Sequence, residues 1–200
     1  MSSDIRLQAY RGAEAGSLVD GLAALRIKVF ADWPYLYEGD REYEARYLGH
    51  FLAGEGAFVA AAFDGDQLVG AATAAPLVQH MDDIAEPVRA LDLDPAAIFY
   101  LSESVLLSEY RGSGIGHRFF DMREAEAMRQ GFRASMFCAV DRQPDDPRRP
   151  SDARSLEPFW RTRGYRKIDG PKAHISWRER GHSDESDHTL TLWLRDLNGE

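Results

Sequence analysis

The segment SVLLSEYRGSGIGH, residues 104–117, leads from an apolar strand through a glycine-rich turn into the start of a helix. Its alternating glycines, Gly112, Gly114 and Gly116, let backbone N–H groups approach a ligand without interference from a Cβ atom. The first turn of the following helix adds unpaired N–H groups and the positive end of the helix dipole. The segment therefore predicts a loop that binds an anion such as phosphate.

Two familiar phosphate loops differ from this segment. A P-loop ends in Gly-Lys-Ser/Thr, so that the lysine reaches the phosphates and the hydroxyl reaches magnesium, whereas this loop ends in Ile115-Gly116-His117. A dinucleotide fingerprint needs glycine or alanine at the position of His117 and a strand that ends directly before Gly112. Asp141, at the end of the next expected strand, keeps dinucleotide binding open as an alternative.

The loop resembles the pyrophosphate loop of the GNAT superfamily of N-acetyltransferases, whose signature is Gln/Arg-x-x-Gly-x-Gly/Ala after a strand. The run Arg111-Gly112-Ser113-Gly114-Ile115-Gly116 fits every defined position. Downstream, residues 157–165 (EPFWRTRGY) are similar to the "FYxxxGF" helix end of the same family. The two matches occur in the right order, and the resemblance extends from Ile5 to about Leu197.

This resemblance implies an α/β (α+β) fold with a GNAT-like mixed, mostly antiparallel central sheet, split between its fourth and fifth strands and flanked by helices. We expect these two strands at residues 98–107 and 135–140. A chain of 200 residues that is 44% hydrophobic can bury one sizeable core. We therefore expect a single N-acetyltransferase domain over residues 1–200.

Hydrophobic periodicity and turn signals predict the other elements. Strands are expected at residues 5–10, 57–63, 67–76, 173–178 and 188–194. Helices are expected from residue 17, over 41–52, within 79–93, over 116–130 and before Gly164. On the helix 116–130, Phe119, Met122 and Ala125 are expected to be buried, and Gly131 to end the helix. The loop 141–155 is longer than usual, which suggests a functional role.

The resemblance also implies that acetyl-CoA is the cosubstrate and enters the gap between the fourth and fifth strands. The main chain of Val105, Leu106 and Leu107 would hold the pantetheine arm, with the Leu106 N–H as our choice of donor to the developing oxyanion. The diphosphate would be held by the glycine-rich loop. Its expected binding residues are Arg111, Gly112, Ser113, Gly114, Ile115, Gly116 and His117.

Acetyl transfer to an amine requires a base, because an ammonium group with a pKa near 10 is mostly charged at neutral pH. Glu103 is the candidate, since it lies in an otherwise apolar strand three residues before Leu106. The alternative is that Glu103 only pairs with an arginine. Strict strand alternation would place Tyr100, Ser102 and Ser104 on the opposite face from Glu103, and the sequence leaves open which face meets the acceptor.

One departure from the family concerns the general acid, which in many relatives is a tyrosine at the position of Trp160. An indole cannot usefully donate a proton, so Tyr165, Tyr100 or water would have to protonate the leaving thiolate. Tyr165 is also compatible with a purely structural role as a packed ring. Cys138 is interpreted as a small buried hydrophobic residue, with an acyl-cysteine intermediate as the alternative.

For the acceptor, the resemblance indicates that Trp33, Tyr35 and Tyr37 wall the pocket; the alternative is that they cover the core. The net charge of -9 argues against a nucleic-acid surface. No apolar run approaches the ~20 residues that span a bilayer, and the polar start lacks a signal-peptide core, so we expect a cytoplasmic protein without membrane contact. Scattered histidines and one cysteine predict no metal site. Exposed sheet edges leave a homodimer open.

Together these features predict an N-acetyltransferase that moves an acetyl group from acetyl-CoA directly to a primary amine of a small molecule or peptide. The alternative is a CoA-binding sensor or subunit without turnover. Trp160 is the residue that favours this alternative.

Overall fold

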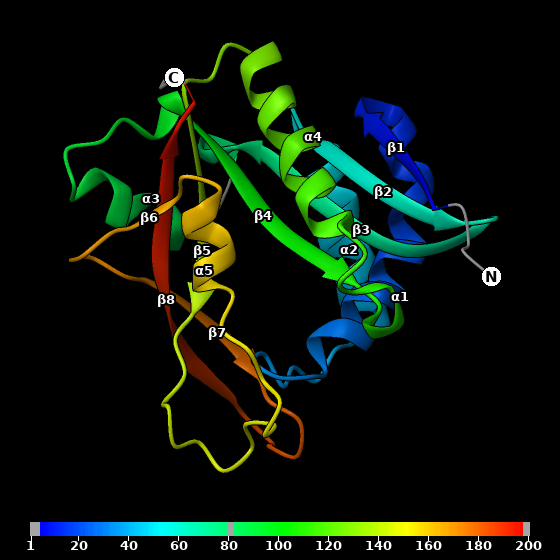
Figure 1. Ribbon diagram of the computed structural model, residues 1–200, viewed down its shortest axis with the longest axis vertical. Helices are drawn as coiled ribbons and strands as arrows, with labels where there is room; N and C mark the ends of the chain where they lie inside the picture. The colour runs from blue at the N-terminus through cyan, green and yellow to red at the C-terminus, as the bar shows by residue number, and fades with distance from the viewer. Residues whose placement is uncertain (1–4, 80–81, 198–200) are drawn as a thin grey trace.

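The computed structural model describes residues 5–79 and 82–197 (Figure 1). Eight strands form one sheet in the order β1-β2-β3-β4-β5-β8-β6, and β7 pairs with β8. The strands are β1 Arg6–Arg11, β2 Phe58–Asp64, β3 Gln67–Pro76, β4 Ile98–Leu106, β5 Ala134–Val140, β6 Arg166–Lys167, β7 Ala173–Arg178 and β8 Glu185–Asp196. The α-helices are α1 Val19–Phe30, α2 Arg41–Leu52, α3 Asp82–Arg89, α4 Ile115–Arg129 and α5 Glu157–Thr162. Short 3₁₀ turns lie at Gly12–Leu18, Leu77–Gln79, Pro95–Ala97 and Ser108–Tyr110.

The sheet opens between β4 and β5. These strands run parallel and pair only over Ile98–Tyr100 and Ala134–Met136, although β4 continues to Leu106 and β5 to Val140 (Figure 1). The other strand pairs are antiparallel. The mostly antiparallel sheet, split between the fourth and fifth strands, is therefore confirmed.

A β-bulge interrupts β4 near the point where the sheet opens. Thr73 of β3 faces Glu103, but Ala75 faces Tyr100, so β4 carries one extra residue over this stretch. A bulge of this kind shifts the alternation of side chains between the two faces. The expectation that strict alternation separates Glu103 from Tyr100 and Ser102 is therefore wrong: all three line one cavity.

Arg123 of α4 contacts the backbone of both strands at this bulge. The buried guanidinium of Arg123 donates hydrogen bonds to the carbonyl oxygens of Glu103, at 3.1 Å, and Thr73, at 3.4 Å. Burial lowers the pKa of Arg123 to about 10. Arg123 thereby ties α4 to the irregular part of β4, since a bulge disrupts the regular ladder of backbone hydrogen bonds.

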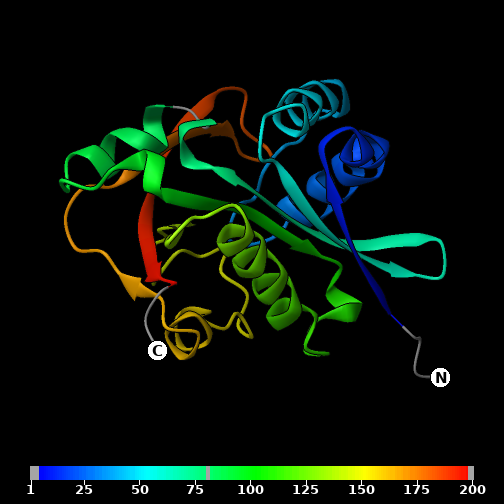
Figure 2. The same cartoon turned by 90° about the horizontal axis from the view of Figure 1, so that it is seen from above.

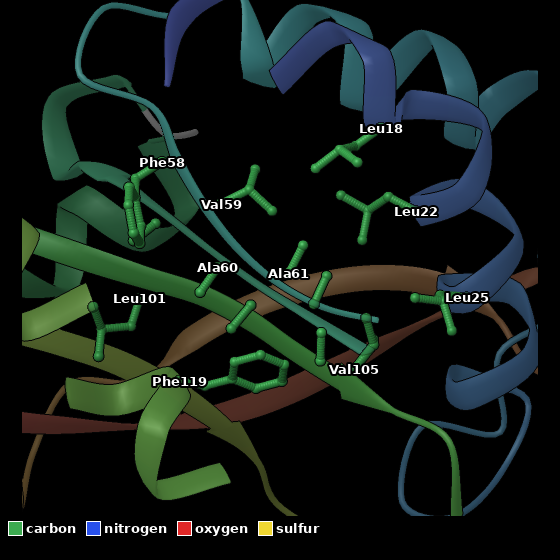
Figure 3. Close-up of a cluster of buried hydrophobic side chains, with 14 of the residues drawn as sticks. Leu18, Leu22, Leu25, Phe58, Val59, Ala60, Ala61, Leu101, Val105 and Phe119 are labelled. Atoms are coloured by element: carbon green, nitrogen blue, oxygen red, sulfur yellow. The ribbon is translucent and has the colours of Figure 1, made fainter. Parts of the chain in front are cut away.

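The helices cover both faces of the sheet. Helices α1 and α2 lie on one face, whereas α4 and α5 lie on the other (Figure 2). Leu22 and Leu25 of α1 approach the strands from one side and Phe119 of α4 approaches from the other (Figure 3). The middle of β2 is built of alanines, Ala60, Ala61 and Ala62, all fully buried, so helices can pack closely on either side.

Most expected elements lie within one or two residues of their predicted bounds, and α2 and β7 match residue for residue. The first helix is shorter than expected, because a 3₁₀ turn precedes Val19. The final strand is longer, starting at Glu185. Part of the segment 79–93, residues 80–81, lies outside the described residues. Helix α4 ends before Gly131, whose φ is +87°.

The buried face of α4 differs from the prediction. Ala125 is exposed and Met122 is only partly buried. The helix instead buries Phe119 and Phe120 together with three charged side chains, Arg123, Glu124 and Glu126. Within the described ranges, no helix has the length and apolar character needed to cross a membrane.

Candidate active site

The glycine-rich loop joins β4 to α4. Gly112 and Gly114 have φ values of +78° and +84°, which favour glycine, and α4 begins immediately after Gly114. The Arg118 N–H makes the first helical hydrogen bond back to the Gly114 carbonyl, so the N–H groups of residues 115–117 precede the helical ladder. A Cβ added at Gly112, Gly114 or Gly116 would meet no atom within 4 Å. The loop is thus an open cradle of main-chain donors, and it fits a diphosphate.

Polar side chains of the loop brace the turn. The Arg111 Nε donates to the carbonyl of Leu106 at 3.2 Å, which places a positive charge at the end of β4. The Ser113 hydroxyl donates to the Tyr110 carbonyl at 2.6 Å. The His117 ring packs edge-on against Phe159 of α5, with centroids 4.7 Å apart. The turn is held by these contacts, which leaves its N–H groups for a ligand.

The end of β4 presents its amides in two directions. The Leu107 N–H donates to the Val69 carbonyl at 3.0 Å, and Leu106 faces Gly70 in the register of the two strands. In an antiparallel ladder, this pattern points the Leu106 N–H away from β3 and toward the gap. By the same alternation the Val105 amide faces β3. Of the three main-chain donors predicted from sequence, Leu106 is therefore the one directed at the gap.

A cavity of about 540 Å³ lies on the α1–α2 side of the gap. Its lining combines helices α1 and α2, the loop between them, β4, β5 and β7. Eight of its eighteen lining residues are Phe, Tyr or Trp. The aromatic lining residues are Phe30, Tyr35, Tyr37, Tyr43, Tyr47, Phe51, Tyr100 and Trp177.

Three charged side chains meet at this cavity. Arg26 of α1 forms ion pairs with Glu44 of α2 and Glu103 of β4. The side chains of Arg26, Glu44 and Glu103 are only 12%, 0% and 9% exposed. The guanidinium also lies over the rings of Phe30, at 5.1 Å, and Tyr47, at 4.9 Å. Glu103 therefore both pairs with an arginine and faces the cavity.

The two oxygens of the Glu103 carboxylate differ in their partners. Its Oε2 pairs with Arg26, whereas Oε1 is buried and has no hydrogen-bond partner within the described part of the chain. The Glu103 side chain lines the cavity and is only 9% exposed, so an acceptor amine there would approach a largely desolvated carboxylate. This arrangement suits a group that removes a proton from a bound amine.

A sequence profile described as the Acetyltransferase (GNAT) family matches residues 24–149. The chain belongs to the GNAT family. No curated protein matches it. Its fold is shared with solved GNAT structures, although the identities are low.

Three of these structures illustrate the likeness. A GNAT-family acetyltransferase from Staphylococcus aureus Mu50 has a TM-score of 0.62 at 15% identity, over 97% of this chain and 99% of that chain. An aminoglycoside 6'-N-acetyltransferase complexed with coenzyme A has a TM-score of 0.61 at 15% identity, over 98% of both chains. A ribosomal-protein-alanine N-acetyltransferase from Brucella melitensis has a TM-score of 0.61 at 14% identity, over 94% of this chain and 99% of that chain.

In this GNAT protein, Tyr100 and Cys138 meet where the sheet opens. Burial is the first cause that raises the pKa of Tyr100 well above 10, followed by the nearby Cys138. Burial also raises the pKa of Cys138 to about 12. The thiol is therefore protonated at neutral pH, which disfavours the acyl-cysteine alternative. The Tyr100 hydroxyl likewise keeps its proton at neutral pH, and Tyr100 lines the cavity from the last paired position of β4 and β5.

Tyr165 lies elsewhere in the GNAT fold. Its buried hydroxyl is 2.8 Å from the Ser135 hydroxyl and donates to Glu124 at 3.0 Å. Glu124 also accepts hydrogen bonds from Arg163 and Arg195. Tyr165 thus belongs to a structural network that joins α4, β5 and β8. Trp160 packs against the rings of Phe137 and Trp193, at 5.0 and 5.1 Å.

The predicted acceptor loop divides into two parts. Tyr35 and Tyr37 line the cavity, whereas Trp33 lies outside the lining, with the Arg142 guanidinium 5.7 Å from its ring. The Tyr35 ring contacts Phe30 at 4.5 Å and Trp177 at 5.8 Å. Burial and, next, hydrogen bonding to Glu44 raise the pKa of Tyr37.

The long loop after β5, residues 141–155, anchors the loop at Pro34 and Tyr35 that forms part of the cavity wall. Arg142 donates to the carbonyl oxygens of Pro34, at 2.6 Å, and Tyr35, at 3.0 Å. The Trp177 Nε1 donates to the same Tyr35 carbonyl at 3.0 Å. Arg142 is fixed in turn by an ion pair with the buried Glu179, at 2.6 Å.

Sequence reasoning missed several residues of the site. It did not single out Arg26 and Trp177, which line the cavity, or Glu44 and Arg142, which hold Arg26 and the loop at Pro34 in place. The sequence signals near them are the helically spaced aromatic residues Tyr43, Tyr47 and Phe51 of α2 and the unusual length of the loop 141–155. Within residues 5–79 and 82–197, no cluster of three His, Cys, Asp or Glu side chains could hold a metal ion.

Proposed function

We propose that this GNAT protein transfers the acetyl group of acetyl-CoA directly to a primary amine. The observation that carries the proposal is the meeting of two features at the split in the sheet. The Leu106 N–H is directed into the gap, and the Glu103 side chain lines the adjacent cavity. An acyl carbonyl and an amine would be brought together there. The open glycine loop at the end of β4 supports CoA as the acyl carrier.

Glu103, Leu106 and Tyr100 each have one role in the proposed reaction. Acetyl-CoA supplies an acetyl thioester. Glu103 accepts a proton from the acceptor ammonium, and the freed nitrogen lone pair forms the new N–C bond. The Leu106 N–H donates to the oxyanion that develops as this bond forms. When the C–S bond breaks, Tyr100 gives its proton to the thiolate and takes up the proton that the attacking nitrogen loses as it becomes an amide, while Glu103 returns its proton to solvent.

The CoA part of the proposal is tested by a pair of substitutions at one position. Gly114→Glu places a carboxylate at the mouth of the loop, while Gly114→Asn places a neutral polar group there. Asparagine tolerates positive φ better than most residues, and both variants are expected to lose about 1–2 kcal/mol of stability. A like charge about 5 Å from a phosphate costs on the order of 3 kcal/mol at an effective dielectric constant of ~20. Calorimetry should therefore show about a hundredfold weaker CoA binding for Gly114→Glu than for Gly114→Asn.

The transfer itself is tested by following thiol release from acetyl-CoA with a panel of amines. We expect release with at least one amine, and equal CoA affinity for both Gly114 variants would contradict the placement of the loop. Tight CoA binding without release from any amine would favour the sensor alternative, which the substitution of tyrosine by Trp160 supports. A thermal shift with NAD but not with CoA would favour dinucleotide binding.

A further inference from the structure

The aromatic cavity and the charged triad beside it, Arg26, Glu44 and Glu103, also indicate which class of amine is the acceptor. We propose that the acceptor is a small monoamine, with one ammonium group attached to a flat apolar body, as in an arylalkylamine. This inference rests on the proposed function and names the substrate class for the same site. It derives from the aromatic walls of the cavity and from the balance of charge beside it.

The walls favour a flat apolar body. The rings pack in two groups: Tyr35 contacts Phe30 at 4.5 Å and Trp177 at 5.8 Å, and Tyr47 stacks on Phe51 at 6.4 Å. Aromatic rings bind other rings in offset or edge-on geometry, and their faces attract cations. A cavity of about 540 Å³ is in the range that encloses a small molecule.

The charges beside the cavity can neutralise one bound cation. Arg26 carries one positive charge and is already paired with both Glu44 and Glu103, so the triad has a net charge of −1. Of the two carboxylates, that of Glu103 belongs to a residue that lines the cavity. An acceptor ammonium would complete the pairing there. Among the described lining residues, Glu103 has the only carboxylate, so a second ammonium would find no counter-charge.

The same residues disfavour an acceptor that carries a carboxylate. Arg26 is the only lysine or arginine among the described lining residues, and both of its carboxylate partners are buried with it. An amino-acid carboxylate would have to displace one of them and leave it unpaired. Burying an unpaired charge is strongly unfavourable, so we expect at least about a hundredfold discrimination against polyamines, aminoglycosides and amino acids.

The test compares kcat/KM for five probes by thiol release. These are 2-phenylethylamine, L-phenylalanine, spermidine, kanamycin and a short peptide with a free amino terminus. L-Phenylalanine is the closest control, because it differs from 2-phenylethylamine only by its carboxylate. We expect 2-phenylethylamine to exceed each of the others by about a hundredfold. Equal or better turnover of any other probe would overturn the inference and leave the proposed function intact.

A binding measurement separates the two proposals when turnover is absent. Calorimetry on the protein saturated with CoA would compare 2-phenylethylamine with L-phenylalanine and spermidine. Selective binding of 2-phenylethylamine without thiol release from any probe would refute the proposed function and uphold the acceptor class. Absence of selective binding as well would refute both.

Substitutions at Ile175 give a second test. This β7 residue lines the cavity and has no place in the proposed chemistry. Ile175→Glu adds a second carboxylate, whereas Ile175→Gln adds a side chain of the same shape without the charge. We expect the ratio of spermidine to 2-phenylethylamine turnover to rise at least about tenfold in Ile175→Glu and to stay near the wild-type ratio in Ile175→Gln. An unchanged ratio of spermidine to 2-phenylethylamine turnover in a folded Ile175→Glu protein would contradict the inference. If that variant does not fold, the comparison of the five probes on the wild-type protein tests the inference by itself.

Discussion

Removal of the Arg26 guanidinium should destabilise the protein strongly. Arg26→Met keeps most of the length of the side chain but leaves Glu44, fully buried, and Glu103, 9% exposed, without their shared partner. Breaking a buried ion pair by removing one member typically costs about 3–5 kcal/mol, because the remaining charge stays buried. Loss of the contacts with the Phe30 and Tyr47 rings adds roughly 1 kcal/mol. The expected loss is therefore about 4–6 kcal/mol.

Urea unfolding followed by circular dichroism measures this loss directly. For a domain of this size, the same loss corresponds to a fall in Tm of about 10–20 °C. Arg46→Met is the matched control, since Arg46 is exposed on α2, and it should change the free energy of unfolding by less than about 0.5 kcal/mol. Adding Glu44→Gln to Arg26→Met should restore at least about 1 kcal/mol, because one of the two unpaired charges is removed. A loss below about 1 kcal/mol for Arg26→Met, or no recovery in the double variant, would show that the triad does not carry buried charge as described.

Three further outcomes are expected. Glu103→Gln should lower kcat/KM by about 10²–10⁴ with CoA affinity unchanged, and a joint loss of both would point to misfolding instead of a lost base. With a pKa of about 12, the Cys138 thiol should react with iodoacetamide about a thousandfold more slowly than a free cysteine at pH 8. The rate should rise about tenfold per pH unit. Rapid labelling of the native protein would show that the thiol is not buried as described. Tyr165→Phe should cost about 1–3 kcal/mol of stability, since Ser135 and Glu124 lose a buried partner, and a large fall in kcat at unchanged stability would instead make Tyr165 the general acid.

The parts of this fold that could be predicted from sequence are those encoded by neighbouring residues. The loop around Gly112 and Gly114 was recognisable because positive φ values and a helix start leave a local signature. Helix α2 carries its apolar residues at helical spacing, and β7 alternates along its length, so their bounds could be read directly. The split of the sheet followed only from the family resemblance.

The features that could not be predicted depend on residues distant in sequence. The extra residue in β4 leaves no mark in an apolar strand, yet it brings Tyr100, Ser102 and Glu103 to one cavity. The triad likewise joins Arg26, Glu44 and Glu103 from three elements. Periodicity on α4 also failed at Ala125, because buried arginine and glutamate side chains pair across elements and take positions that apolar residues were expected to fill.

The way in which the cavity wall is anchored bears on how its selectivity can evolve. The side chains of Arg142 and Trp177 donate hydrogen bonds to the main-chain carbonyl oxygens of Pro34 and Tyr35. Every residue type supplies such an oxygen. The ring at position 35 or 37 can therefore change its size or polarity while the anchoring bonds persist. Descendants of this protein could acquire new acceptors by single substitutions, without first needing a compensating mutation to keep the loop in place.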